Sequence, residues 1–201
     1  MTRSLGREQV FRIFSPEMSE IVGALVAESV RRNFRLFLVG GPVRDLLLGR
    51  PVGDIDLLLE APALSLKGVG DVARAALPAS VKVVEHGRFG TVRLEAGHAK
   101  LDVALARRET YRAVGALPTV EPATLEEDLL RRDFSVNALA LDLSTKSAAA
   151  RMKLVDPMGG LEDLARRQLR ILHAKSFHDD PTRALRAARI GPRLGFGLER
   201  G

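Results

Sequence analysis

Residues 35–60, RLFLVGGPVRDLLLGRPVGDIDLLLE, decide the fold class of this 201-residue chain. The apolar run RLFLV predicts a strand that ends at Gly40-Gly41. Pro42 favours the start of a helix and Gly49 favours its end, so we expect a short helix between them. Asp54–Leu59 predicts a second strand. This strand–turn–helix–strand unit indicates an α/β or α+β fold.

The rest of the sequence adds helices and a small meander of strands. Apolar spacing and capping signals predict helices at residues 15–32, 64–77, 125–142, 161–167 and 181–189. Strands are expected at residues 81–85, 91–95 and 100–106, with turn-like links that indicate an antiparallel meander. Residues 110–124 contain two prolines and predict a loop. Because Pro192 lacks an N–H group and disfavours helix before it, we expect an interruption at Ile190-Gly191-Pro192.

The composition excludes several classes of protein. Hydrophobic residues make up 46% and charged residues 28% of the chain, which is typical of a soluble globular protein, and no apolar run reaches the length of a membrane span. The absence of cysteine excludes disulfides, thiolate catalysis and cysteine-ligated zinc. The first residues are too polar for a signal peptide, so a cytoplasmic enzyme is the simplest interpretation.

The charge distribution favours an anionic partner. Arginine supplies 25 of the 31 basic residues, and the net charge of +6 resides between Arg166 and Arg200, where nine basic residues accompany three acidic ones. Guanidinium groups match phosphates and base edges, so this bias favours nucleotide or RNA binding. A solvated helix face is the alternative explanation.

Two motifs in residues 35–60 suit phosphate and metal chemistry. Gly40 and Gly41 allow a phosphate to approach the backbone beside a helix N-terminus, and Arg44 can add charged hydrogen bonds. Asp54 and Asp56 share one strand face, where a Mg²⁺ ion would offset their mutual repulsion. Each motif by itself has a simpler explanation: the glycine pair could be a plain turn, and the two aspartates could have a strand-end or turn role.

Three further groups are weaker signals by themselves. Asp102, between apolar residues of a predicted strand, is either a third metal carboxylate or an exposed aspartate. Asp133 and Asn137 share a predicted helix face and could bind a pair of ribose hydroxyls. Asp180 can cap the last helix, which carries a stripe of arginines. The stripe consists of Arg183, Arg186 and Arg189. Solvated helices with charged faces are the simpler explanation of the last two groups.

These fragments occur in an order that resembles the class II tRNA nucleotidyltransferases and bacterial poly(A) polymerases. Residues 38–45 (LVGGPVRD) with 54–56 (DID) resemble motif A of that family, and residues 126–138 (EEDLLRRDFSVNA) resemble motif B. Residues 156–160 (DPMGG) with Asp163 are similar to motif C, and residues 179–186 (DDPTRALR) are similar to motif D. The resemblance covers about Phe34 to Glu199.

The resemblance implies an α+β fold, namely a polymerase-beta-like nucleotidyltransferase palm followed by the start of a helical neck. The palm would contain a mixed or antiparallel sheet with flanking helices. An N-terminal segment and helix (residues 1–32) would precede the head (33–150), and the hinge and start of the neck (151–201) would follow. The body and tail domains of the family are expected to be absent from this chain.

The same resemblance implies roles for residues of the four motifs. The implied catalytic residues and ligands of two Mg²⁺ ions are Asp54 and Asp56. Asp102 is a candidate third ligand only by its place on a neighbouring predicted strand. The implied nucleotide-binding residues are Gly40, Gly41, Arg44, Arg132, Asp133, Asn137, Asp180, Arg183, Arg186 and Arg189. Asp133 and neighbouring arginines would recognise the ribose. Asp180 and Arg183 would bond to the base edge of ATP or CTP.

We therefore expect a template-independent enzyme that adds CMP, AMP or both from NTPs to tRNA 3′ ends and releases pyrophosphate. A poly(A) polymerase acting on general RNA is the nearest alternative, because motifs A to D do not separate the two. A nucleotide-binding module without catalysis is another. The expected partners are an NTP and tRNA or other RNA, with no membrane.

Overall fold

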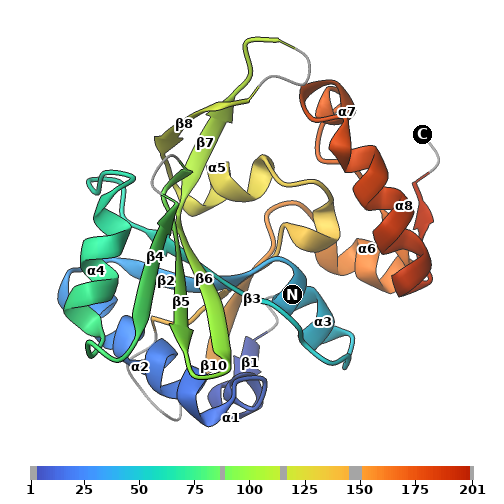
Figure 1. Cartoon of the computed structure of the whole chain (residues 1–201). Coiled ribbons are helices and arrows are strands. Elements are labelled where there is room, and N and C mark those ends of the chain that lie inside the picture. Colours follow the sequence, from blue (N-terminus) through green and yellow to red (C-terminus); the bar gives the residue numbers. More distant parts are fainter. Residues whose placement is uncertain (1–3, 87–88, 114–116, 145–150, 200–201) are drawn as a thin grey trace.

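A mixed eight-stranded sheet is the centre of the computed structural model, which describes residues 4–86, 89–113, 117–144 and 151–199 (Figure 1). The strand order is β1-β10-β9-β2-β3-β6-β5-β4. The strands are β1 (Ser4–Gly6), β2 (Arg35–Val39), β3 (Ile55–Glu60), β4 (Lys82–His86), β5 (Thr91–Ala96), β6 (Ala99–Leu105), β9 (Ala140–Asp142) and β10 (Arg151–Val155). Only β3 and β6 are parallel neighbours within this described sheet.

Helices surround this sheet, which confirms the predicted α+β class. They are α1 (Arg7–Phe11), α2 (Pro16–Arg31), α3 (Gly41–Leu47), α4 (Gly68–Ala76), α5 (Leu125–Leu130), α6 (Gly160–Arg166), α7 (Ser176–Asp179), α8 (Thr182–Leu194) and the 3₁₀ helix η2 (Ser135–Asn137). Two small strand pairs lie outside the sheet: β7 (Arg107–Thr110) with β8 (Thr119–Pro122), and β11 (Gln168–Leu169) with β12 (Gly197–Leu198). In the part of the chain that is described, no helix is long and apolar enough to cross a membrane.

The two faces of the sheet are covered by different helices. Leu38 of β2 packs in the core formed with α2 and α4, whereas Phe37 packs on the other face against Leu129 of α5. α2 and α4 lie to the left of the sheet in Figure 1, and α6, α7 and α8 lie to the right. Leu58 of β3 shares the Phe37 face. Because side chains alternate along a strand, Asp56 points to that same face.

Local sequence signals placed several elements correctly. Ser15 is the N-cap of α2, with its Oγ accepting the Met18 N–H at 3.3 Å, and Pro16 occupies the first turn. The strand–turn–helix–strand unit appears as β2, α3 and β3, and the meander as β4, β5 and β6. The helix predicted at residues 64–77 begins later, at Gly68.

The continuous helix predicted at residues 125–142 is wrong. α5 ends at Leu130, and Phe134 is extended, with φ −135° and ψ 151°. Phe134 forms a bridge with Ile171, and residues 140–142 then form β9, which pairs with both β2 and β10. Two strands, β2 and β10, thus gain a backbone partner from a segment whose apolar residues also fit a helix.

Two other predictions are wrong, one for a loop and one for a helix interruption. Residues 119–122, expected within a loop, form β8 in an antiparallel pair with β7. The last helix is not interrupted, because α8 continues through Pro192 to Leu194. The steric conflict before a proline involves the Cβ of the preceding residue, and that residue is Gly191.

Candidate active site

A pocket of about 680 Å³ lies between α3, β3, β7, η2, α8 and the segment that follows α5. It brings together residues from all parts of the sequence that resembled motifs A, B and D. The predicted residues at its wall are Gly40, Gly41, Arg44, Asp54, Asp56, Arg132, Asp133, Asn137, Asp180, Arg183, Arg186 and Arg189. Asp102 lies outside this wall and lines a neighbouring pocket of about 250 Å³, which it shares with Asp54 and Asp56.

The turn after β2 requires a glycine at position 40. Gly40 has φ +73°, and a Cβ atom there would lie 2.9 Å from Nη1 of Arg132. A larger residue would therefore meet both backbone strain and a guanidinium group. Gly40 thus allows the segment that resembles motif B to approach the end of β2.

Arg44 is buried beside this turn, with 3% of its surface exposed. Its Nε and Nη2 donate to the Asp45 carboxylate at 2.8 and 2.9 Å, and its Nη1 donates to Oδ1 of Asn137. Such fixed bonds hold the guanidinium in one orientation at the wall of the pocket.

A chain of hydrogen bonds links Arg44 to α8. Asn137 Nδ2 donates to Oδ1 of Asp133 at 2.9 Å, and Nε of Arg186 donates to Oδ2 of Asp133 at 2.7 Å. Asp133 and Asn137 do not share an α-helix face as predicted, because Asn137 belongs to η2. Their side chains nevertheless meet, because the short helix turns back beneath Asp133, whose Oδ1 also accepts the Phe134 N–H.

Asp56 of β3 lies in a row of charged side chains that crosses three strands, whereas Asp54 precedes β3, which begins at Ile55 and not at Asp54 as predicted. Asp56 is opposite Asp102 of β6, and Asp102 is opposite Arg93 of β5. Burial raises the pKa of Asp56, Arg132 opposes that rise, and the charges of Asp102 and Asp54 add to it. Burial is thus the main cause that disfavours the charged form of Asp56, and the nearby carboxylates of Asp102 and Asp54 act in the same direction.

Asp102 has a protein partner in this row. Arg93 donates from Nε to Oδ1 at 2.8 Å and from Nη2 to Oδ2 at 2.9 Å, which is a two-point ion pair. Among the described residues, no group of three or more His, Asp or Glu side chains is arranged to hold a metal ion. A metal-binding role for Asp102 therefore stays a prediction.

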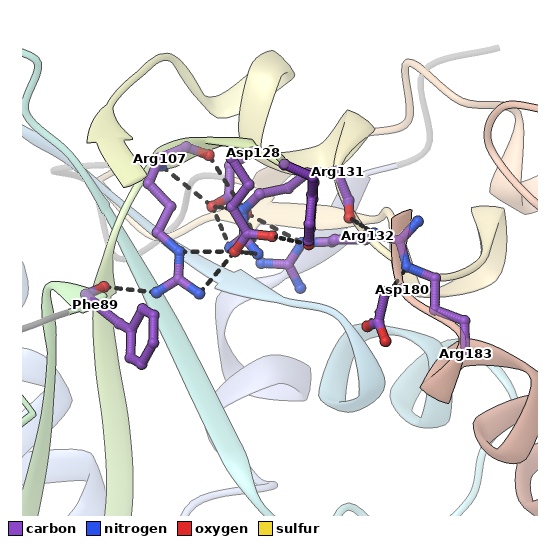
Figure 2. A network of polar contacts seen from close by, with 9 residues as sticks. Phe89, Arg107, Asp128, Arg131, Arg132, Asp180 and Arg183 are labelled. Atoms are coloured by element: carbon purple, nitrogen blue, oxygen red, sulfur yellow. Dashed lines mark hydrogen bonds and ion pairs between the residues drawn. The ribbon is translucent and has the colours of Figure 1, made fainter. Parts of the chain in front are cut away.

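A second polar network lies behind the pocket, with the fully buried Asp128 at its centre (Figure 2). Arg131 donates to Oδ1 of Asp128 from Nε and Nη2 at 3.0 and 2.6 Å, and Arg132 donates to Oδ2 from Nε and Nη2 at 3.2 and 2.9 Å. The Arg107 N–H also donates to Oδ1, at 3.3 Å. Burial alone would raise the pKa of Asp128, but Arg132 and Arg131 hold it below its ordinary value.

Glu109 and Tyr111 extend this network to the wall of the pocket and were not predicted from the sequence. Glu109 Oε1 accepts bonds from Arg107 and Arg131, and Tyr111 Oη donates to Oε2 at 2.7 Å. Burial and then the bond to Glu109 raise the pKa of Tyr111 to about 12. The signal available was an acidic residue directly after Arg107 and Arg108, but Glu109 fell between the predicted strand at 100–106 and the predicted loop at 110–124, and it lies in β7.

The N-terminal end of α8 is fixed to the same network. Oδ1 of Asp180 accepts the Thr182 N–H and hydroxyl at 2.9 and 2.6 Å. Arg183 is 4% exposed and donates from Nη1 to Ser176 Oγ at 2.6 Å and from Nη2 to the Arg131 carbonyl at 2.7 Å. Its Nε lies 3.9 Å from Oδ2 of Asp180, and Arg183 and Asp180 both line the pocket.

Comparison with known proteins agrees with this geometry. Residues 36–170 match the family model described as the poly A polymerase head domain. The chain is 46% identical over 166 residues to an A-adding tRNA nucleotidyltransferase of Aquifex aeolicus, covering 83% of this chain and 19% of that protein. It is 44% identical over 161 residues to a CC-adding tRNA nucleotidyltransferase of Deinococcus radiodurans, covering 79% of this chain and 41% of that protein. The chain thus spans less than half the length of either relative.

Solved structures give the same relationship. A CCA-adding enzyme in an apo form superposes with a TM-score of 0.82 at 36% identity, covering 100% of this chain and 45% of that chain. A tRNA nucleotidyltransferase complexed with a primer tRNA and an ATP analogue superposes with a TM-score of 0.69 at 40% identity, covering 88% of this chain and 46% of that chain. Because the family model matches more than half of its residues and the fold agrees, this chain belongs to the poly A polymerase head domain family.

Proposed function

We propose that this chain is the nucleotide-adding part of a template-independent RNA nucleotidyltransferase. It would add CMP, AMP or both from NTPs to the 3′ end of tRNA and release pyrophosphate. The observation that carries this proposal is one pocket whose wall contains Asp56 of β3, Asp54 just before that strand, and four arginines of α8. Carboxylates and arginines in one pocket suit the transfer of a nucleotidyl group from a triphosphate.

Asp54 and Asp56 fit a divalent cation. Their oxygen donors are the kind that Mg²⁺ prefers, and the raised pKa of Asp56 reflects burial and nearby carboxylates, whose charge a cation would offset. We propose that these two residues hold two Mg²⁺ ions. When bound, Mg²⁺ lowers the pKa of the attacking 3′-hydroxyl and neutralises charge on the leaving pyrophosphate.

The remaining residues of the pocket bind and orient the nucleotide. Arg44, held by Asp45 and Asn137, offers a pre-oriented guanidinium group to the triphosphate beside Gly41. Asp133 lies between η2 and α8, where it suits recognition of the ribose. Arg183 and Asp180, which both line the pocket, suit a base edge.

The relatives favour tRNA as the acceptor but differ in the nucleotide added. They include A-adding and CC-adding tRNA nucleotidyltransferases, and similar solved structures contain CTP or ATP. A poly(A) polymerase acting on general RNA remains the second candidate, because the matched family model carries that name. A module that binds nucleotide without transferring it is the third.

A single extension assay separates the three candidates. A tRNA that lacks its 3′ end and an unstructured RNA of equal length would each be incubated with labelled ATP, with labelled CTP, and with both. We expect addition of one to three nucleotides to the tRNA alone, and no addition by Asp54→Asn. Long adenosine tails on both RNAs would indicate a poly(A) polymerase. NTP binding without extension would indicate the non-catalytic module and would contradict the proposal.

Two further predictions belong to this proposal. We propose a cytoplasmic location, where tRNA is processed. We also propose a head at residues 33–150, preceded by the segment 1–32 and followed by the hinge and start of the neck at 151–201. Strand β10, at the start of the last segment, pairs with β9 of the head, so the proposed division crosses one sheet.

A further inference from the structure

Helix α8 is attached to the rest of the pocket at its N-terminal end and in its middle. Arg183 bonds to Ser176 and to the carbonyl of Arg131, and Arg186 bonds to Asp133. These contacts fix the half of α8 next to Asp180. They do not reach Arg193, which lies at the wall of the pocket near the other end of the helix.

The C-terminal end of α8 is held by Arg50, a residue outside the wall of the main pocket. Arg50 lies in the link between α3 and β3, four residues before Asp54. Its Nη1 donates to the Arg193 carbonyl at 2.8 Å, and its Nη2 donates to the Leu194 carbonyl at 3.2 Å. The last carbonyls of a helix have no partners within the helix, so one guanidinium group satisfies two of them and complements the helix dipole.

Two features make this attachment important for the position of the helix end. Pro192 removes one N–H donor from the last turns of α8, which weakens the helix there. Asp45, which holds Arg44, also lies 3.8 Å from Nη2 of Arg193. The end of α8 is therefore attached both to α3, through Asp45, and to the link that follows α3, through Arg50.

We propose that Arg50 is a positioning residue that sets the separation between the C-terminal half of α8 and α3. Arg189 and Arg193 on α8 would then face Arg44 and Gly41 across a fixed gap that fits a triphosphate. The proposal rests on the proposed function, because it assigns this end of the pocket to the triphosphate. It predicts that Arg50 governs triphosphate affinity, whereas base selection depends on the separately anchored end at Arg183.

The expected effect of Arg50→Ala follows from this separation. The arginines of α8 would keep their charge but lose a fixed position, and pre-organised sites bind more tightly than mobile ones. Loss of two hydrogen bonds to a charged group, partly exposed to water, is expected to weaken triphosphate binding about tenfold. The ratio of ATP to GTP affinity is expected to stay the same.

The test is equilibrium binding of ATP, GTP and inorganic tripolyphosphate in the presence of Mg²⁺, measured by calorimetry. Arg151→Ala is the matched control, because Arg151 also donates to a backbone carbonyl, that of Ser4, but joins β10 to β1 away from the pocket. We expect about tenfold weaker binding of all three ligands by Arg50→Ala and no change in Arg151→Ala. Arg50→Lys should be intermediate, because an ammonium group lacks the fork that reaches two carbonyls.

Unchanged tripolyphosphate binding in Arg50→Ala would overturn the proposal, and so would a changed ratio of ATP to GTP affinity. Failure of the wild-type protein to bind any NTP would instead reject the proposed function. The position of α8 can be tested independently of nucleotide, because the chain has no cysteine of its own. Spin labels at Ala188→Cys and Ala79→Cys, both exposed, would report the distance from α8 to the sheet. A broader distance distribution in Arg50→Ala supports the proposal, and an unchanged distribution overturns it. Arg50→Lys takes the place of Arg50→Ala in this measurement if the alanine variant does not fold.

Discussion

Replacing Asp128 with alanine is expected to lower the free energy of unfolding by about 3 to 4 kcal/mol. The Asp128 side chain is fully buried and is the shared partner of Arg131 and Arg132. Removing one member of a buried ion pair typically costs about 3 to 5 kcal/mol, because the other charge stays without compensation. The two arginine side chains are 20% and 17% exposed, so water can solvate them in part, which places the estimate at the lower end.

Urea unfolding followed by circular dichroism measures this change, and the melting temperature should fall by about 10 °C for a chain of this size. Glu121→Ala is the control, because Glu121 and its partner Arg108 are 56% and 57% exposed and such pairs contribute about 0.5 kcal/mol or less. Because the folded pKa of Asp128 is depressed, its contribution is present above its unfolded pKa of about 3.9 and is lost as the pH falls through the folded value. The difference between the wild type and Asp128→Ala should therefore shrink below about pH 4. A difference under about 1 kcal/mol at pH 7 would refute the reasoning.

Three other substitutions test the site. Asp56→Asn is expected to abolish nucleotide transfer. Because the pKa of Asp56 is raised in the folded state, the same substitution should increase the free energy of unfolding in metal-free buffer above about pH 4, with no increase at lower pH. A wild-type transfer rate or a loss of stability at pH 7 would contradict this. Arg183→Lys should reduce discrimination between ATP and GTP more than it reduces tripolyphosphate binding, and equal discrimination in an NTP competition assay would show that the base is selected elsewhere. Gly40→Ala should destabilise the fold by about 1 to 2 kcal/mol, because its φ of +73° and the nearby Arg132 guanidinium both oppose a Cβ atom. Gly49→Ala, with φ +66° and no neighbour within 4 Å, is the control for a Cβ atom added at positive φ without a steric neighbour.

Local signals in the sequence determined the elements whose residues interact with near neighbours along the chain. The cap at Ser15 and Pro16 and the β4-β5-β6 meander depend on contacts between near neighbours along the chain. The composition also predicted a folded chain with an excess of arginine. The grouping of twelve predicted residues around one pocket came from the order of four motifs and their resemblance to a family, since no local pattern relates residues 40 and 186.

Tertiary contacts decided the parts where the same residues suit two structures. Residues 125–142 have apolar spacing that fits a helix, but Leu141 is buried between β2 and β10 and pairs with Leu38 and Leu154. Backbone hydrogen bonds to β2 and β10 stabilise this short segment as a strand more than helical propensity could stabilise it as a helix. Likewise, Arg93 could be matched with Asp102 only once the strand register was known, and the bonds from Arg50 to the end of α8 join residues more than 140 positions apart. Such partners depend on how the chain folds back on itself, which short-range patterns in the sequence do not encode.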